Sequence, residues 1–93
     1  MEALTEKIIL EKLQDFQDWT YQENAIHTSI EFRDFKDAFS VMTRIAFEAE
    51  KLNHHPDWTN VYNTLQISLS THDAGGVTNK DFELAKIIDA LVS

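Results

Sequence analysis

The chain has 93 residues, with 16 acidic and 8 basic side chains and a formal net charge of −8. This length suits a single domain, residues 1–93, with one modest core, and the absence of cysteine excludes disulfides and thiolate metal sites. The acidic balance argues against direct nucleic-acid binding, and no apolar run is long enough to cross a membrane. Because the first residues also lack the pattern of a signal peptide, we expect a soluble, cytoplasmic protein.

The first third of the chain predicts a helix followed by two strands. Residues 5–16 carry apolar side chains at helical spacing, with Thr5 as a plausible N-cap. Residues 19–21 favour a short strand, and residues 25–32 alternate between apolar and polar side chains. This alternation places His27 on the polar side of its strand, away from the core.

The longest predicted element is a helix that begins after Asp34, a good N-cap. Its apolar side chains recur at steps of three and four, so we expect one stripe of them to face the core. The stripe comprises Phe35, Phe39, Met42, Ala46, Ala49 and Leu52, with Ile45 beside it. Proline disfavours helical angles in the preceding residue, so Pro56 should end this helix at about His54 or His55.

The last part of the chain predicts two more strands and a final helix. Residues 58–62 favour a strand, and residues 65–69 alternate before a loop that holds the two adjacent glycines. Thr78 is an N-cap with Asp81 three residues later, which starts the last helix. The order α-β-β-α-β-β-α predicts an α+β fold: a four-stranded antiparallel sheet with helices packed on one face.

Three of the four histidines stand at predicted element ends: His54, His55 and His72. Glu50 lies four residues before His54, so the two can meet on one helical face and the carboxylate can orient the imidazole. Asp81 is a further possible support. The residues alone leave three interpretations open: acid–base catalysis by the imidazoles, a zinc site, or ordinary polar residues.

Several segments together resemble the pterin-4a-carbinolamine dehydratase family, over most of the chain from about Trp19 to the last helix. The segment before the histidine pair is similar to the family's long helix and the strand end that precedes it. The segments that carry the resemblance are EKLNHHPDW (50–58), NVY (60–62), LSTH (69–72), GGVTNKD (75–81) and FRDFKDAFSVMTRIAFEAEKL (32–52).

The resemblance implies an enzyme, a hydro-lyase that dehydrates 4a-hydroxytetrahydrobiopterin to the quinonoid dihydropterin. The substrate is the carbinolamine that aromatic amino-acid hydroxylases release, for example in phenylalanine hydroxylation, so the role is tetrahydrobiopterin recycling. The hydroxyl on C4a must leave as water and the adjacent ring nitrogen must lose its proton, for which an acid and a base suffice. The resemblance therefore favours the acid–base interpretation and implies no metal and no other cofactor.

The resemblance also assigns roles to residues. It implies that His54, His55 and His72 are the catalytic residues, and our hypothesis is that His54 and His72 act as acid and base while His55 orients the pterin. Glu50 tunes His54. The remaining residues expected to line the substrate pocket are Asn53, Trp58, Ser70, Thr71 and Asp73.

One position departs from some relatives, which have arginine where this chain has Lys80; lysine keeps the charge but loses the planar fork. A different class of function is a protein-interaction module without catalysis, because animal members of the family also bind the dimerisation helices of a homeodomain transcription factor. The family also implies a homodimer or homotetramer, and pairing through sheet edges is the expected contact.

Overall fold

The computed structural model describes residues 2–93, so Met1, the first residue of the predicted domain, lies outside the described part. The α-helices are α1 (Glu6–Lys12), α2 (Phe35–Leu52) and α3 (Asn79–Val92). The strands are β1 (Thr20–Gln22), β2 (Ala25–Glu31), β3 (Asp57–Val61) and β4 (Thr64–Leu69). Two short 3-10 helices follow α1 and β4, namely η1 (Leu13–Asp15) and η2 (His72–Ala74).

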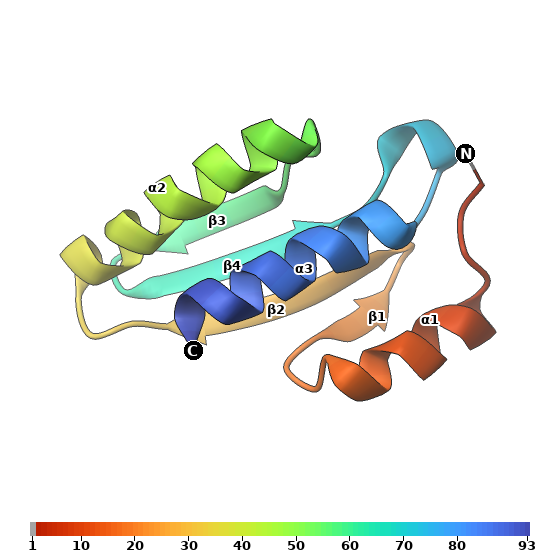
Figure 1. Ribbon diagram of the computed structural model, residues 1–93. Helices are drawn as coiled ribbons and strands as arrows, with labels where there is room; N and C mark the ends of the chain where they lie inside the picture. Colours follow the sequence, from red (N-terminus) through yellow and green to blue (C-terminus); the bar gives the residue numbers. More distant parts are fainter. Residues whose placement is uncertain (1) are drawn as a thin grey trace.

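The strands form one antiparallel sheet in the order β1-β2-β4-β3. The two central strands, β2 and β4, are in register over most of their length, with Ile26 opposite Leu69 and Ile30 opposite Leu65. Figure 1 shows α2 and α3 side by side over the sheet, with α1 next to β1. The predicted α+β fold, with its antiparallel sheet and its helices on one face, is confirmed.

The hydrophobic core lies between the inner face of the sheet and the helices. Because side chains alternate along a strand, every second residue of the central strands faces the helices. The buried apolar side chains of these strands and of α3 include Ile26, Leu65, Ile67, Leu69, Leu84, Ala85 and Ile88. Burying a leucine or isoleucine side chain contributes about 1.5–3 kcal/mol, so this cluster holds the sheet and α3 together.

His27 lies on the outer face of the sheet, as its place in the alternation predicts. It pairs in register with Thr20 on one side and Ser68 on the other, and its Nε2 lies 3.0 Å from the carbonyl oxygen of Gln22. It is therefore separated by the sheet from the core and from the helices.

The predicted core stripe of α2 is partly wrong. The buried residues of α2 are Ala38, Ile45 and Ala49, with Met42 and Leu52 partly buried against the core. Phe35 and Phe39 are 48% and 56% exposed, and Ala46 is exposed too. Apolar side chains cover so much of this helix that spacing alone did not fix which part faces the sheet. The helix turns Ala38, Ile45 and Ala49 inward and leaves Phe35 and Phe39 at the surface.

The C-terminal end of α2 also differs from the prediction. The last helical residue is Leu52, because Asn53 adopts a left-handed conformation with φ +52°. The backbone N–H of His54 then donates to the carbonyl of Ala49 at 3.1 Å, which closes the helix as in a Schellman motif. Asparagine adopts this conformation more readily than most residues, so the helix ends before proline could stop it. The histidine pair therefore follows the helix instead of forming its last turn.

Candidate functional site

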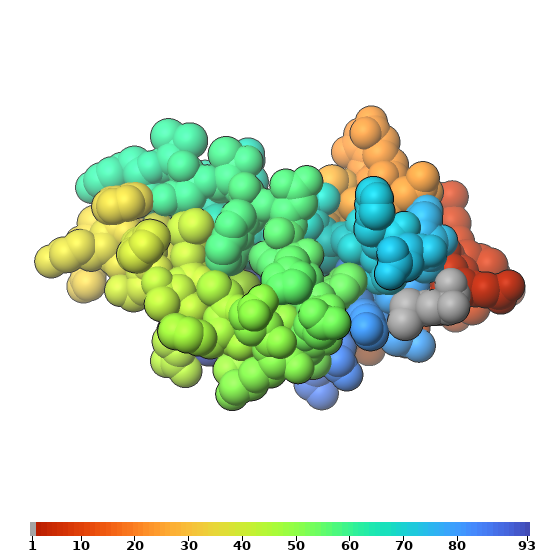
Figure 2. Space-filling model, turned by 90° about the horizontal axis from the view of Figure 1, so that it is seen from above, coloured from red at the N-terminus to blue at the C-terminus, as the bar shows by residue number. Residues whose placement is uncertain are grey.

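A hollow of about 520 Å³ lies between the C-terminal end of α2, the loop after β4 and the start of α3. Figure 2 shows the first two of these segments, in green and cyan, next to each other at the surface. The hollow is lined by Asn53, His54, His55, Ser70, Thr71, His72, Asp73 and Lys80. The structure thus brings the three predicted catalytic histidines to one cavity from two separate segments of the chain.

A tight turn fixes the segment that carries His72, the first residue of η2. The carbonyl of Thr71 accepts from the N–H groups of Ala74 and Gly75, each at 3.0 Å, and the N–H of Thr71 donates to Gly76 at 2.8 Å. Gly75 has φ +73°, a left-handed conformation that a glycine adopts without steric cost. The imidazole of His72 itself is exposed and makes no side-chain hydrogen bond within residues 2–93.

His54 is the buried member of the histidine pair, and its partner is Asp81. The imidazole Nε2 lies 2.5 Å from Oδ1 of Asp81, although the two residues are 27 positions apart in the chain. His54 is 8% exposed and Asp81 is fully buried. The contact therefore ties the end of α2 to the first turn of α3.

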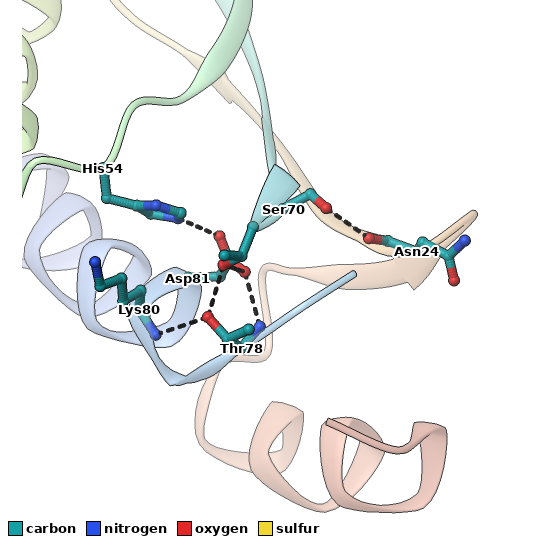
Figure 3. Close-up of polar contacts among 7 residues, drawn as sticks. Asn24, His54, Ser70, Thr78, Lys80 and Asp81 are labelled. Atoms are coloured by element: carbon teal, nitrogen blue, oxygen red, sulfur yellow. Dashed lines mark hydrogen bonds and ion pairs between the residues drawn. The ribbon is translucent and has the colours of Figure 1, made fainter. Parts of the chain in front are cut away.

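The second carboxylate oxygen of Asp81 is held as firmly as the first. It accepts from the hydroxyl of Thr71 and from the backbone N–H of Thr78, both at 2.9 Å, as Figure 3 shows for Thr78. The hydroxyls of Thr71 and Thr78 lie 2.6 Å apart. Because the proton of Thr71 points to Asp81, Thr78 is the donor in this pair. Three hydrogen-bond donors thus replace the hydration that the carboxylate of Asp81 loses on burial.

This network fixes how His54 can exchange protons. An ionised carboxylate only accepts hydrogen bonds, so the Nε2 of His54 must carry a proton and donate it to Asp81. The remaining ring nitrogen, Nδ1, is then the atom that can accept a proton, or release one from the charged ring. A buried carboxylate in this position also balances the positive charge of the imidazolium when it forms.

The predicted contact between Glu50 and His54 is wrong. Glu50 binds His55 instead, with Oε2 2.6 Å from Nε2, and both side chains are exposed. The reason is the early end of α2 at Asn53, which removes His54 from the helical face that Glu50 occupies. Because this pair is exposed to solvent, it adds little to stability and serves mainly to orient His55.

Three of the predicted site residues do not line the hollow: Glu50, Trp58 and Asp81. Asp81 is connected to the hollow by its hydrogen bond with His54. Trp58, on β3, is partly buried against the hydrophobic core. Lys80 does line the hollow, although the sequence pattern marked it only as a departure from relatives. Its place directly before Asp81 in the chain was the available signal, since Asp81 was an expected support.

Other features of the described residues bear on the alternatives. Within residues 2–93, no group of three or more histidine, cysteine, aspartate or glutamate side chains is arranged to hold a metal ion. In the same part of the chain, no helix is both long and apolar enough to span a membrane. A larger hollow, of about 760 Å³, lies on the outer face of the sheet, but His27 is the one histidine that lines it.

Comparison with known proteins places this geometry in a family. The sequence pattern of the family described as Pterin 4 alpha carbinolamine dehydratase matches residues 2–91. A protein of Christiangramia forsetii, provisionally named as a pterin-4-alpha-carbinolamine dehydratase, is 60% identical over 92 residues, which cover 99% of this chain and 95% of that protein. A protein of Solibacter usitatus with the same provisional name is 49% identical over 90 residues, 97% of this chain and 95% of its own length.

A solved structure agrees with these matches. The crystal structure of a transcriptional coactivator/pterin dehydratase from Brucella melitensis superimposes with a TM-score of 0.96 at 38% identity. The superposition covers 99% of this chain and all of that one. Sequence and fold therefore agree over nearly the whole length, and the chain belongs to the pterin-4a-carbinolamine dehydratase family.

Proposed function

We propose that this protein dehydrates a 4a-hydroxytetrahydropterin to the quinonoid dihydropterin. The observation that carries the proposal is the hollow itself, which is lined by His54, held by a buried carboxylate, and by His72, whose ring makes no side-chain hydrogen bond within residues 2–93. Family membership supplies the substrate class, a pterin carbinolamine. The reaction removes one molecule of water and transfers no electrons, so proton exchange is the chemistry that it demands.

The two histidines differ in a way that suits the two proton transfers. In our assignment, Nδ1 of His54 takes the proton from ring nitrogen N5, and Asp81 balances the charge of the resulting imidazolium. His72 gives a proton to the C4a hydroxyl, which leaves as water while the C4a–N5 double bond forms. The exposed ring of His72 regains its proton from solvent. General acid and base catalysis of this kind contributes roughly 10²- to 10⁴-fold.

The other lining residues would hold the pterin in place. His55, itself oriented by Glu50, orients the ring, and Asn53 and Ser70 offer hydrogen bonds at the rim. The amino-pyrimidinone edge of a pterin presents adjacent N–H donors, which a carboxylate such as Asp73 can accept together. We assign no direct substrate contact to Trp58.

In the cell, we propose that the reaction takes place in the cytoplasm and returns the pterin released by an aromatic amino-acid hydroxylase to the tetrahydrobiopterin pool. We further propose a homo-oligomer. The edge strand β3 has free backbone groups, and Phe35, Phe39 and Phe47 are exposed on α2, which supports pairing through both surfaces.

The same exposed phenylalanines support a second candidate, a protein-interaction module that binds partner helices. This candidate makes no use of the bond between His54 and Asp81 or of the histidine-lined hollow. A dehydration assay therefore separates the two candidates, because an interaction module would not accelerate the reaction.

The decisive experiment measures dehydration of a freshly generated carbinolamine by stopped-flow absorbance. The variants are His54→Gln, which keeps a donor for Asp81, His72→Ala, and the double variant. We expect each single change to lower the rate about ten- to hundredfold and the double variant to match the uncatalysed rate. His27→Ala, on the outer face of the sheet, is the matched control and should keep full activity. Full activity in the double variant would reject the proposal.

A further inference from the structure

Lys80 is unusual among the cations of this chain. Of the 8 lysine and arginine side chains, only Lys12 and Lys80 are partly buried, and the other six are exposed. The partial burial of Lys12 is explained by Phe82, because the Nζ of Lys12 lies 5.8 Å from the centroid of that ring. Lys80 has no such aromatic partner within residues 2–93.

Lys80 lies in the wall of the histidine-lined hollow. Figure 3 shows the side chain of Lys80 extending from the first turn of α3 toward the side of Asp81 on which His54 lies. Within residues 2–93, none of the ion pairs includes Lys80. Asp81, the next residue in the chain, is bound at both oxygens, and Asp73, which lines the same hollow, forms no ion pair with Lys80.

Lys80 is partly buried as a residue, but no side-chain nitrogen within residues 2–93 is buried without a partner, so its ammonium group reaches the water of the hollow. No ion pair within residues 2–93 engages this ammonium group, and the hollow leaves room for a ligand beside it. A ligand atom that accepts hydrogen bonds would therefore complete the site.

The chemistry of a pterin identifies the acceptor. The carbonyl oxygen on C4 projects along the same edge of the ring system as N5, and C4 is bonded directly to C4a. A donor beside the base that deprotonates N5 is therefore within reach of this carbonyl oxygen. In the proposed function His54 is that base, and Lys80 lies on the same wall.

We infer that Lys80 donates a hydrogen bond to the C4 carbonyl oxygen of the pterin and makes the site specific for 4-oxo over 4-amino pteridines. This inference rests on the proposed function for the placement of the ring. A 4-amino group presents N–H donors where the carbonyl presents an acceptor. Two hydrogen-bond donors would then face each other, and the hydrogen bond from Lys80 would be lost. Arginine at this position offers several donors, so it should keep the preference.

The test is equilibrium binding of two stable probes, 7,8-dihydropterin and 2,4-diamino-7,8-dihydropteridine, to the folded protein. The wild type should prefer the 4-oxo probe by roughly ten- to hundredfold, the range expected for a hydrogen bond to a charged group. Lys80→Met should lose most of this preference through weaker binding of the 4-oxo probe. Lys80→Arg should retain it, and Lys86→Met, at an exposed position on the same helix, should leave both affinities unchanged.

Unchanged preference in Lys80→Met would overturn the inference. Circular dichroism confirms that each variant is folded. The readout needs no turnover, so a wild type that binds and discriminates but does not accelerate dehydration would reject the proposed function and leave this inference standing.

Discussion

Asp81 belongs to two local structures at once. It closes the capping box at the start of α3 by accepting from the N–H of Thr78, and it accepts from the buried imidazole of His54. A capping residue is fixed by the helix that it caps, so the carboxylate is already in place before any ligand arrives. The imidazole of His54 is thereby held in one tautomer at the cavity wall.

The first prediction concerns Asp81→Asn, which keeps the size of the side chain but removes its charge. The asparagine amide can donate to His54, which would reverse the tautomer and leave Nδ1 protonated. We expect kcat for dehydration to fall about ten- to hundredfold, with KM nearly unchanged, because the binding surface of the hollow is preserved.

Asp89→Asn is the matched control for this change. Asp89 lies on the same helix and accepts from Nε1 of Trp19 at 2.8 Å, away from the hollow, and asparagine can still accept there. It should leave kcat unchanged. Equal losses in both variants would mean that charge on α3, and not the orientation of His54, controls the rate.

The sequence predicted which residues come together at one hollow better than how they contact one another. Seven predicted residues line one hollow: Asn53, His54, His55, Ser70, Thr71, His72 and Asp73. The assignment of Glu50 to His54 failed because it assumed that the helix continues to His54. A single left-handed residue, Asn53, moves Glu50 to His55 and leaves His54 to a carboxylate 27 residues away. Sequence spacing carries no information on that long-range contact.

At the scale of elements, the turn after β4 determines where His72 stands. Gly75, with φ +73°, lets the chain reverse so that Thr71 can pair with Gly76 across the turn. The N-terminal segment supports this turn from outside, because the N–H of Leu4 donates to the carbonyl of Val77 at 2.7 Å. Figure 1 shows the segment that precedes α1, in red, running up toward this loop.

The second prediction is that Gly75→Ala lowers the free energy of unfolding by about 1 kcal/mol, since alanine is strained at positive φ. Steric contact is not the cause, because a Cβ at this position meets no atom within 4 Å. Gly75→Asn should cost less, because asparagine tolerates this conformation. Urea denaturation of the three proteins gives the comparison. An alanine variant as stable as the wild type would show that the turn does not need glycine.

Most elements could be predicted from local patterns, and the exceptions have physical reasons. The alternation in β2 and β4 and the N-caps of all three helices at Thr5, Asp34 and Thr78 were readable in the sequence. The strand ends differ from the predicted ones by at most one residue, because pairing with a neighbouring strand decides where a strand ends. The face of α2 that packs on the sheet could not be predicted, because apolar residues occur on more than one side of this helix. Which side is buried is decided by packing against the rest of the fold.

At the scale of the molecule, α2 has apolar residues on two sides. One side packs on the core through Ala38, Ile45 and Ala49, whereas Phe35, Phe39 and Phe47 face outward, the last at 66% exposure. Figure 2 shows α2, in yellow to green, forming much of the face seen from above. Exposed aromatic side chains on one helix favour burial against another copy of the chain.

The third prediction follows for the proposed homo-oligomer. Replacing Phe39 and Phe47 together by glutamine should lower the molar mass measured by light scattering, while β3 can still pair through its free edge. Leu10→Gln, which removes a half-exposed side chain from α1, is the control and should leave the mass unchanged. A double variant with the wild-type mass would exclude α2 from the interface.

The central claim is that one cavity holds the pterin between His54 and His72. A crystal structure of the protein with bound 7,8-dihydropterin tests it most directly. We predict the ring in the hollow at the end of α2, with N5 nearest His54, C4a facing His72 and the C4 oxygen toward Lys80. A pterin bound instead in the larger hollow on the outer face of the sheet, beside His27, would contradict the account.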